Sequence, residues 1–169
     1  MIFRLTQKLA KKIGETPTSC LPPDVNPFAD WTGHLFTVER VQYIILTNTP
    51  SLYSIVFPGR GVTGHNSFLR ESFSYMHDFM AGDGNEFFFR RFIEPRMNEV
   101  SFSKSGDRSV LGSMNELILQ TKYYLRSRGL SPFEAATHVN ESPMSYLGHQ
   151  HPAKAFRNLK IREVNAAVV

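Results

Sequence analysis

The sequence predicts an α+β fold, in which a mostly antiparallel sheet of four to five strands carries helices packed on one face and continues into a helical C-terminal part. Residues 33–57 contain three short strand patterns separated by turn residues, which is typical of an antiparallel meander. Residues 66–81 and 109–128 each carry apolar side chains at helical spacing. The regular strand–helix alternation of a doubly wound parallel sheet does not occur in this order of elements.

The N-terminal segment predicts a strand followed by a short amphipathic helix. Residues 1–5 are apolar and compatible with a strand, and Thr6 is a residue type that commonly caps helices. Leu9 and Ile13 are separated by four positions, as on one face of a helix, and Gly14 is typical of a helix end.

Residues 15–30 predict an irregular connector, because the four prolines in this segment resist helix formation. Three strands follow at residues 33–38, 42–47 and 52–57. The second of them is apolar at successive positions, as expected of a central strand. The residues Asn-Thr-Pro-Ser at 48–51 indicate a turn between the last two strands.

The second half of the chain predicts mainly helices. Apolar side chains at helical spacing indicate helices over residues 66–81, 85–93 and 109–128, and an alternating pattern indicates one more strand over 100–103. A further helix begins after Ser131, because Ser, Pro and Glu follow one another at the positions that each favours in a first helical turn.

Length and charge predict one α+β domain over residues 1–150 and a basic C-terminal helix or tail over residues 151–169. The chain has 169 residues, the size of one ordinary domain, and a formal net charge of +4. Residues 1–12 contain four basic side chains and no acid, and residues 150–169 carry a net charge of +3. Such basic ends either meet nucleic acid or an acidic partner, or form solvated helix faces. The N-terminal candidates for such contacts are Arg4, Lys8, Lys11 and Lys12.

Cysteine and histidine usage argues against disulfides, metals and cofactors. Cys20 is the single cysteine, which excludes an intrachain disulfide and a zinc site built on several thiolates. The six histidines follow no metal-ligand motif, so we expect no metal and no cofactor. The sequence shows neither a leader pattern nor a membrane-spanning apolar run, and we expect a cytoplasmic protein without membrane contact.

Residues 106–117 form the most distinctive motif, a loop rich in Gly and Ser that leads into the longest predicted helix. Free N–H groups at a helix start can hold an anion, and Arg108 can add a bidentate contact to a phosphate. A structural interpretation stays open beside this one. Either Ser113 and Glu116 form a capping box, or Asp107 caps the helix.

Five segments of the chain carry a family resemblance: residues 3–9, 31–40, 46–48, 108–117 and 143–152. The most specific of them contains the run Arg-Ser-Val-Leu-Gly-Ser-Met-Asn. In these segments the chain resembles a group of short bacterial proteins that carry a domain of unknown function. The resemblance implies a cytoplasmic protein and brings no assigned activity, cofactor or catalytic residue. The candidate ligand-binding or partner-binding residues within these segments are Arg40, Asn48, Arg108, Ser109, Ser113 and Asn115.

The function expected first is a small non-enzymatic binding module for an acidic or phosphate-bearing partner, with nucleic acid as one case. One alternative is a phosphoryl-group hydrolase or nuclease with a site around residues 108–115, so the sequence leaves open whether the protein is an enzyme. Another is helix-turn-helix DNA binding through residues 131–147, where Glu-Ala-Ala follows a Ser cap as in excisionase-type motifs. In a third, the residues of the 108–115 run serve the architecture alone.

Overall fold

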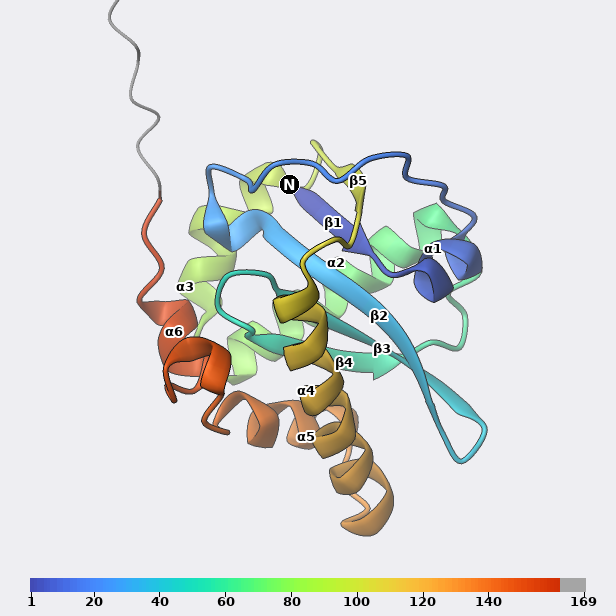
Figure 1. Cartoon of the computed structure of the whole chain (residues 1–169), viewed down its shortest axis with the longest axis vertical. Helices are drawn as coiled ribbons and strands as arrows, with labels where there is room; N and C mark the ends of the chain where they lie inside the picture. The colour runs from blue at the N-terminus through green and yellow to red at the C-terminus, as the bar shows by residue number, and fades with distance from the viewer. Residues whose placement is uncertain (162–169) are drawn as a thin grey trace, which may run out of the picture.

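The computed structural model describes residues 1–161 and contains one five-stranded sheet (Figure 1). Across the sheet the strands follow the order β4-β3-β2-β1-β5. Their bounds are β1 Ile2–Leu5, β2 Asp30–Val38, β3 Val41–Asn48, β4 Ser54–Pro58 and β5 Ser101–Lys104. The β2–β3–β4 meander is antiparallel, as predicted, whereas β1 runs parallel to both of its neighbours, β2 and β5. The sheet is therefore mixed, and most of its paired residues belong to the antiparallel part.

The helices cover both faces of the sheet, and not one face as the sequence suggested. Their bounds are α1 Gln7–Ile13, α2 His65–Gly82, α3 Glu86–Phe88, α4 Arg108–Ser127, α5 Pro132–Asn140 and α6 Pro152–Arg157. In Figure 1, α4 lies in front of the sheet, α2 lies behind it, and α5 lies below, next to the β4 edge of the sheet. Within the described residues, no helix is both long and apolar enough to cross a membrane.

Side-chain alternation along the strands explains why both faces need a cover. Phe3 pairs with Trp31 and so shares its face of the sheet, and the Phe3 ring lies 5.3 Å from that of Phe68 in α2. His34 lies three positions beyond Trp31, so it points to the opposite face, where α4 packs through Ile118. Because β3 is apolar at successive positions, it presents buried side chains to both faces.

Helix α1 packs tightly against β2 at a glycine. A Cβ atom at Gly33 would lie 2.7 Å from Leu9 Cδ2 and 3.1 Å from Leu46 Cδ2, so only glycine leaves room for these side chains. The helix ends at Gly14, whose φ of 72° is left-handed, as the sequence predicted. This close packing fixes the lysines of α1 on the outer side of the helix.

The C-terminal helices belong to the same packed core as the sheet. The Asn140 side chain at the end of α5 accepts a hydrogen bond from the Ser54 N–H and donates one to the Ser54 carbonyl, both at 2.8 Å. The Phe156 ring of α6 is fully buried. Its centroid lies 4.5 Å from the ring centroid of Tyr53 and 5.2 Å from that of Phe28. Helix α6, in the segment expected to form a basic C-terminal helix or tail, thus packs against the sheet and the connector. The end of that segment, residues 162–169, lies outside the described residues.

Candidate functional site

The start of α4 is capped by its own sequence. Asp107 Oδ1 accepts hydrogen bonds from the N–H groups of Ser109, at 2.9 Å, and Val110, at 3.2 Å. The Ser113 hydroxyl donates to the Ser109 carbonyl within the helix, so the capping box predicted at Ser113 and Glu116 is wrong and the Asp107 alternative is confirmed. An anion at this helix start would meet the Asp107 carboxylate and find two of the N–H groups already occupied.

The six candidate residues from the family-like segments do not gather at one place. Arg40 is exposed at the tip of the β2–β3 hairpin, with a φ of 71°. Arg108 and Ser109 are exposed at the start of α4, and Ser113 is buried further along it. Asn115 is exposed and faces a different surface, described below.

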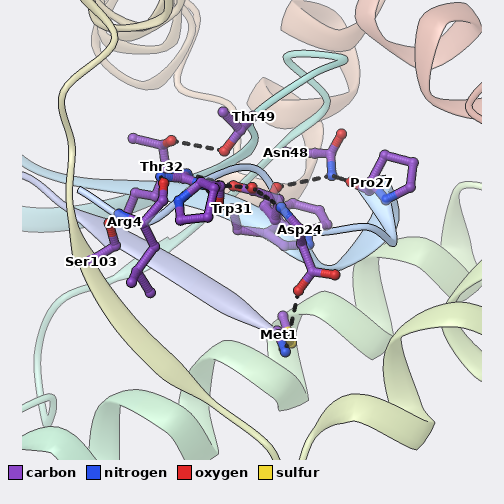
Figure 2. Close-up of polar contacts among 12 residues, drawn as sticks. Met1, Arg4, Asp24, Pro27, Trp31, Thr32, Asn48, Thr49 and Ser103 are labelled. Atoms are coloured by element: carbon purple, nitrogen blue, oxygen red, sulfur yellow. Dashed lines mark hydrogen bonds and ion pairs between the residues drawn. The ribbon is translucent and has the colours of Figure 1, made fainter. Parts of the chain in front are cut away.

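Asn48 has an architectural place in the structure. It is fully buried, and its amide donates to the carbonyls of Pro27, at 2.8 Å, and Asp30, at 3.2 Å (Figure 2). Its Oδ1 accepts a hydrogen bond from the Ser51 hydroxyl at 2.6 Å. These contacts hold the β3–β4 turn against the end of the connector and leave the side chain no free face for a ligand.

The helix-turn-helix interpretation lacks its second helix. Between the end of α5 and residue 147, where the predicted motif ends, the chain forms a single 3-10 turn at Ser145–Leu147, which ends at Gly148 with a left-handed φ of 61°. A recognition helix must present several exposed side chains along a major groove. One turn does not provide such a surface, and α5 itself is bound to β4 through Asn140.

A crevice of about 450 Å³ lies between the connector and α4; we call it the connector crevice. The residues that line it come from β1, the connector, β2, the turn after β3, the loop before α4, the first turn of α4 and the 3-10 turn. They are Arg4, Cys20, Leu21, Pro23, Asp24, Pro27, Asp30, Thr32, Thr49, Pro50, Ser105, Gly106, Asp107, Val110, Leu111 and Tyr146. The crevice therefore joins segments that are distant in the sequence.

A buried ion pair forms one side of the connector crevice. Arg4 Nε and one Nη donate to the two Asp30 carboxylate oxygens, both at 2.8 Å. The same guanidinium donates to the Leu21 carbonyl at 2.7 Å and to the Pro22 carbonyl at 3.0 Å, which holds the connector on the sheet. Arg4 was expected on an exposed basic surface. In the folded chain it is 9% exposed and already engaged in these four bonds.

Asp30 keeps its charge although it is buried. Burial on its own raises the pKa of a carboxyl group, but hydrogen bonds from Arg4, from the Asp24 N–H and from Thr49 act against it and hold the pKa of Asp30 below its ordinary value. Next to it, the hydroxyls of Thr32 and Thr49 lie 2.9 Å apart, as Figure 2 shows. The floor of the connector crevice thus consists of a neutralised ion pair and a pair of hydroxyls.

A second hollow, of about 610 Å³, lies between α1, α4 and the β2–β3 hairpin. We call it the basic groove. Its lining residues are Lys8, Lys11, His34, Leu35, Phe36, Thr37, Gln42, Asn115, Ile118, Leu119 and Lys122. None of them is acidic, and within residues 1–161 its three lysines have no carboxylate at ion-pair distance.

His34 lies at the centre of these charges. Its ring nitrogen Nδ1 is 2.9 Å from the Thr6 hydroxyl. Burial and the positive charges of Lys8 and Lys122 lower the pKa of His34 below its ordinary value, so the ring is neutral at neutral pH. Lys12, also expected to contact a partner, instead donates to Gln42 Oε1 at 2.9 Å.

One part of this groove, the face of α4 that lines it, is predictable from the sequence. Asn115, Ile118, Leu119 and Lys122 are spaced by three, four and seven positions, which places them on one helix face. Helical spacing alone therefore predicts that Asn115 and Lys122 share a face of α4. The meeting of this face with α1 and His34 has no local signal, because it depends on how α1 and α4 pack against β2.

The chain matches a protein family to which no function is assigned. The family described as "Domain of unknown function (DUF6933)" matches residues 2–155. The chain belongs to this family. The expectation of a family without an assigned function is therefore confirmed. No curated protein and no solved structure matches the chain.

Proposed function

We propose that the protein is a binding module whose basic groove holds a phosphate-bearing ligand, specifically a nucleotide unit, either free or within a single strand of nucleic acid. The observation that carries this proposal is the convergence of Lys8 and Lys11 from α1 with Lys122 from α4 on one groove whose lining contains no acid. Three lysines that have no carboxylate at ion-pair distance within residues 1–161 create a positive potential that attracts a phosphate.

The floor of the basic groove suits the rest of a nucleotide. Leu35, Phe36 and Ile118 give it an apolar surface, and Leu119 at its side is 68% exposed. A base can lie on such a surface while its phosphate reaches the lysines, because every base has an apolar face. The exposed amide of Asn115 adds hydrogen-bonding capacity at the same place.

Binding is favoured here over phosphoryl hydrolysis. The hydrolase alternative requires Arg108, Ser113 and Asn115 to share a pocket with a carboxylate or histidine. In the described chain, Arg108 lies at the exposed start of α4 and Ser113 bonds within the helix. Neither of them lines the basic groove, where Asn115 lies with His34, so the three residues do not share a pocket. We therefore assign the phosphate-binding role to the groove and propose no reaction.

The test is fluorescence anisotropy with a labelled single-stranded oligonucleotide, repeated over a range of salt concentrations. Each phosphate contact contributes about 0.7 to the slope of log affinity against log salt, so three lysines predict a slope of about −2. The double variant Lys8→Glu and Lys122→Glu should make this slope shallower by about 1.4 or more, because two phosphate contacts are lost. Lys154→Glu makes the same substitution at one exposed site on α6, which is half of that charge change. It is the control and should shift the logarithm of the affinity by far less than half as much as the double variant.

Competition between a mononucleotide and the oligonucleotide distinguishes a free nucleotide from a nucleic-acid strand as the ligand. A mononucleotide that competes with the oligonucleotide at equal phosphate concentration indicates a free nucleotide ligand, whereas weaker competition indicates a strand. If the wild-type protein binds neither probe at low salt, or if the lysine pair and the Lys154 control behave alike, the proposal is refuted.

A further inference from the structure

We propose that the connector crevice is a second binding site, and that it takes a small organic amine with an apolar body of about one aromatic ring. This site is independent of the basic groove, since the two hollows share no lining residue. The size of the crevice, its apolar walls and the charges around it support this proposal.

The crevice has the size and character of a small-molecule site. Its volume of about 450 Å³ falls within the usual range for such pockets. Its walls are mostly apolar and come from three segments: the connector, the turn after β3 and the first turn of α4. They are formed by Leu21, Pro23, Pro27, Pro50, Val110 and Leu111. Prolines make these walls stiff, so little ordering is needed when a ligand enters.

The charges around the crevice disfavour an anion. Its one cationic side chain, Arg4, is engaged by Asp30 and two connector carbonyls. Asp24 lies 3.5 Å from the amino group of Met1, so these two charges also offset each other, as Figure 2 shows. Asp107 remains as a carboxylate on the lining that no cation neutralises within residues 1–161.

Asp107 and Tyr146 form a place for an ammonium group. The capping bonds of Asp107 use Oδ1, and no hydrogen bond within the described chain uses Oδ2. Asp107 and Tyr146 both line the crevice. Burial and the Asp107 charge raise the pKa of the Tyr146 phenol above its ordinary value. A carboxylate beside an aromatic ring is a favourable environment for an alkylammonium ion.

The floor of the crevice offers acceptors to the opposite end of the ligand. Thr32 is 1% exposed, and its hydroxyl is bonded to that of Thr49. A hydroxyl has two acceptor positions, so this pair can accept a further hydrogen bond. An amine whose ring carries a hydroxyl group therefore fits better than one with a bare ring.

Three probe molecules separate these contributions: tyramine, phenethylamine and phenylacetate. Isothermal titration of the full chain should give a dissociation constant for tyramine of about 1 mM or tighter. Phenethylamine, which lacks the ring hydroxyl, should bind about fivefold more weakly. Phenylacetate, a similar body with a negative charge, should show no binding in the same range. Amide NMR shifts should map tyramine to Thr32, Gly106 and Leu111 and leave the groove residues unchanged.

Variants then assign the two ends of the ligand. Asp107→Asn keeps the helix cap, because Asn caps as well as Asp, and should weaken both amines about fivefold. Asp78→Asn, at an exposed position on α2, is the matched control and should change neither. Thr32→Val should remove the advantage of tyramine over phenethylamine while phenethylamine binds as before.

Three outcomes would overturn the proposal. The first is that none of the probes binds at millimolar concentration. The second is that phenylacetate binds as well as phenethylamine, which would contradict the charge argument. The third is that Asp107→Asn and Asp78→Asn have equal effects. Because Lys8 and Lys122 do not line the crevice, the Lys8→Glu and Lys122→Glu variant should bind tyramine like the wild type, so the two proposals fail independently.

Discussion

Replacing Asp30 by Asn is predicted to destabilise the fold more than any exposed charge change. The Asp30 side chain is 4% exposed and the Arg4 side chain is 11% exposed, so the Asn variant leaves a guanidinium buried without its counter-charge. Breaking a buried pair in this way costs about 3–5 kcal/mol. With a urea m-value of about 2 kcal/mol per molar, the unfolding midpoint should fall by roughly 1.5–2.5 M.

The pH dependence of this effect follows from the lowered pKa of Asp30. The unfolded carboxyl titrates near its ordinary value of about 4, and the folded one titrates below it. In that interval the unfolded chain binds more protons, so the stabilisation is fully present above about pH 4 and is lost as the pH falls through the folded pKa. The difference between the wild type and Asp30→Asn should therefore shrink below about pH 4.

The assay is urea unfolding followed by the fluorescence of Trp31, the one tryptophan of the chain, which is fully buried beside Asp30. Its indole N–H donates to the Phe28 carbonyl at 2.8 Å, so unfolding changes its surroundings. The double variant Arg4→Met and Asp30→Asn removes both charges and should recover about 2 kcal/mol or more of the loss. A midpoint shift below about 0.5 M for Asp30→Asn would refute the reasoning, because a solvated surface pair would give the same result.

Three further predictions concern other parts of the molecule. Asn140→Ala leaves the Ser54 N–H and carbonyl without their side-chain partner and should cost about 2–4 kcal/mol in chemical denaturation; a loss under 1 kcal/mol would mean that water replaces the amide. Gly33→Ala forces Leu9 to move and should cost about 1–3 kcal/mol, measured as a lower melting temperature with α1 helicity retained. His34 has a lowered pKa, and a bound phosphodiester favours its protonated form, so oligonucleotide affinity should rise as the pH falls below about 6.5. His34→Gln should flatten that pH profile, and an unchanged profile would exclude His34 from the site.

Local patterns predicted most of the elements. The meander, the two long helices and the irregular connector were expected from periodicity, turn residues and prolines, and the structure contains all of them. Each of these patterns lies within a short stretch of the chain, so it can be recognised without knowing the tertiary fold. The short helix expected over residues 85–93 is less regular, since α3 continues as a π-helical turn at Phe89–Ile93.

Long-range pairings were beyond the reach of those patterns. Arg4 was grouped with the lysines of α1 because it is basic, yet it lies in an otherwise apolar strand and meets Asp30 at the start of β2. The parallel pairing of β1 with β5 joins residues about one hundred positions apart, and no local spacing reports it. A grouping by charge alone therefore placed a structural arginine together with the lysines of α1.

The same contrast between local patterns and long-range packing applies to the two candidate sites. Lys8 and Lys11 were candidates from the sequence and do line a hollow, whereas their partners Lys122 and His34 come from elements that only the packed sheet brings near. The connector crevice was not anticipated, because its lining is drawn from segments scattered between β1 and the 3-10 turn. The motif at residues 108–115 was ambiguous in the sequence, because Ser, Gly and Asn occur both in ligand sites and at helix ends.

The place of β1 between β2 and β5 has a consequence for biosynthesis. Ribosomes release β1, β2, β3 and β4 well before Ser101–Lys104, so a nascent sheet can pair four strands while the outer edge of β1 stays open. Open strand edges invite pairing with other chains. We expect the interval before β5 is synthesised to be the period in which the growing polypeptide depends most on chaperones, and truncated products that end before β5 to aggregate.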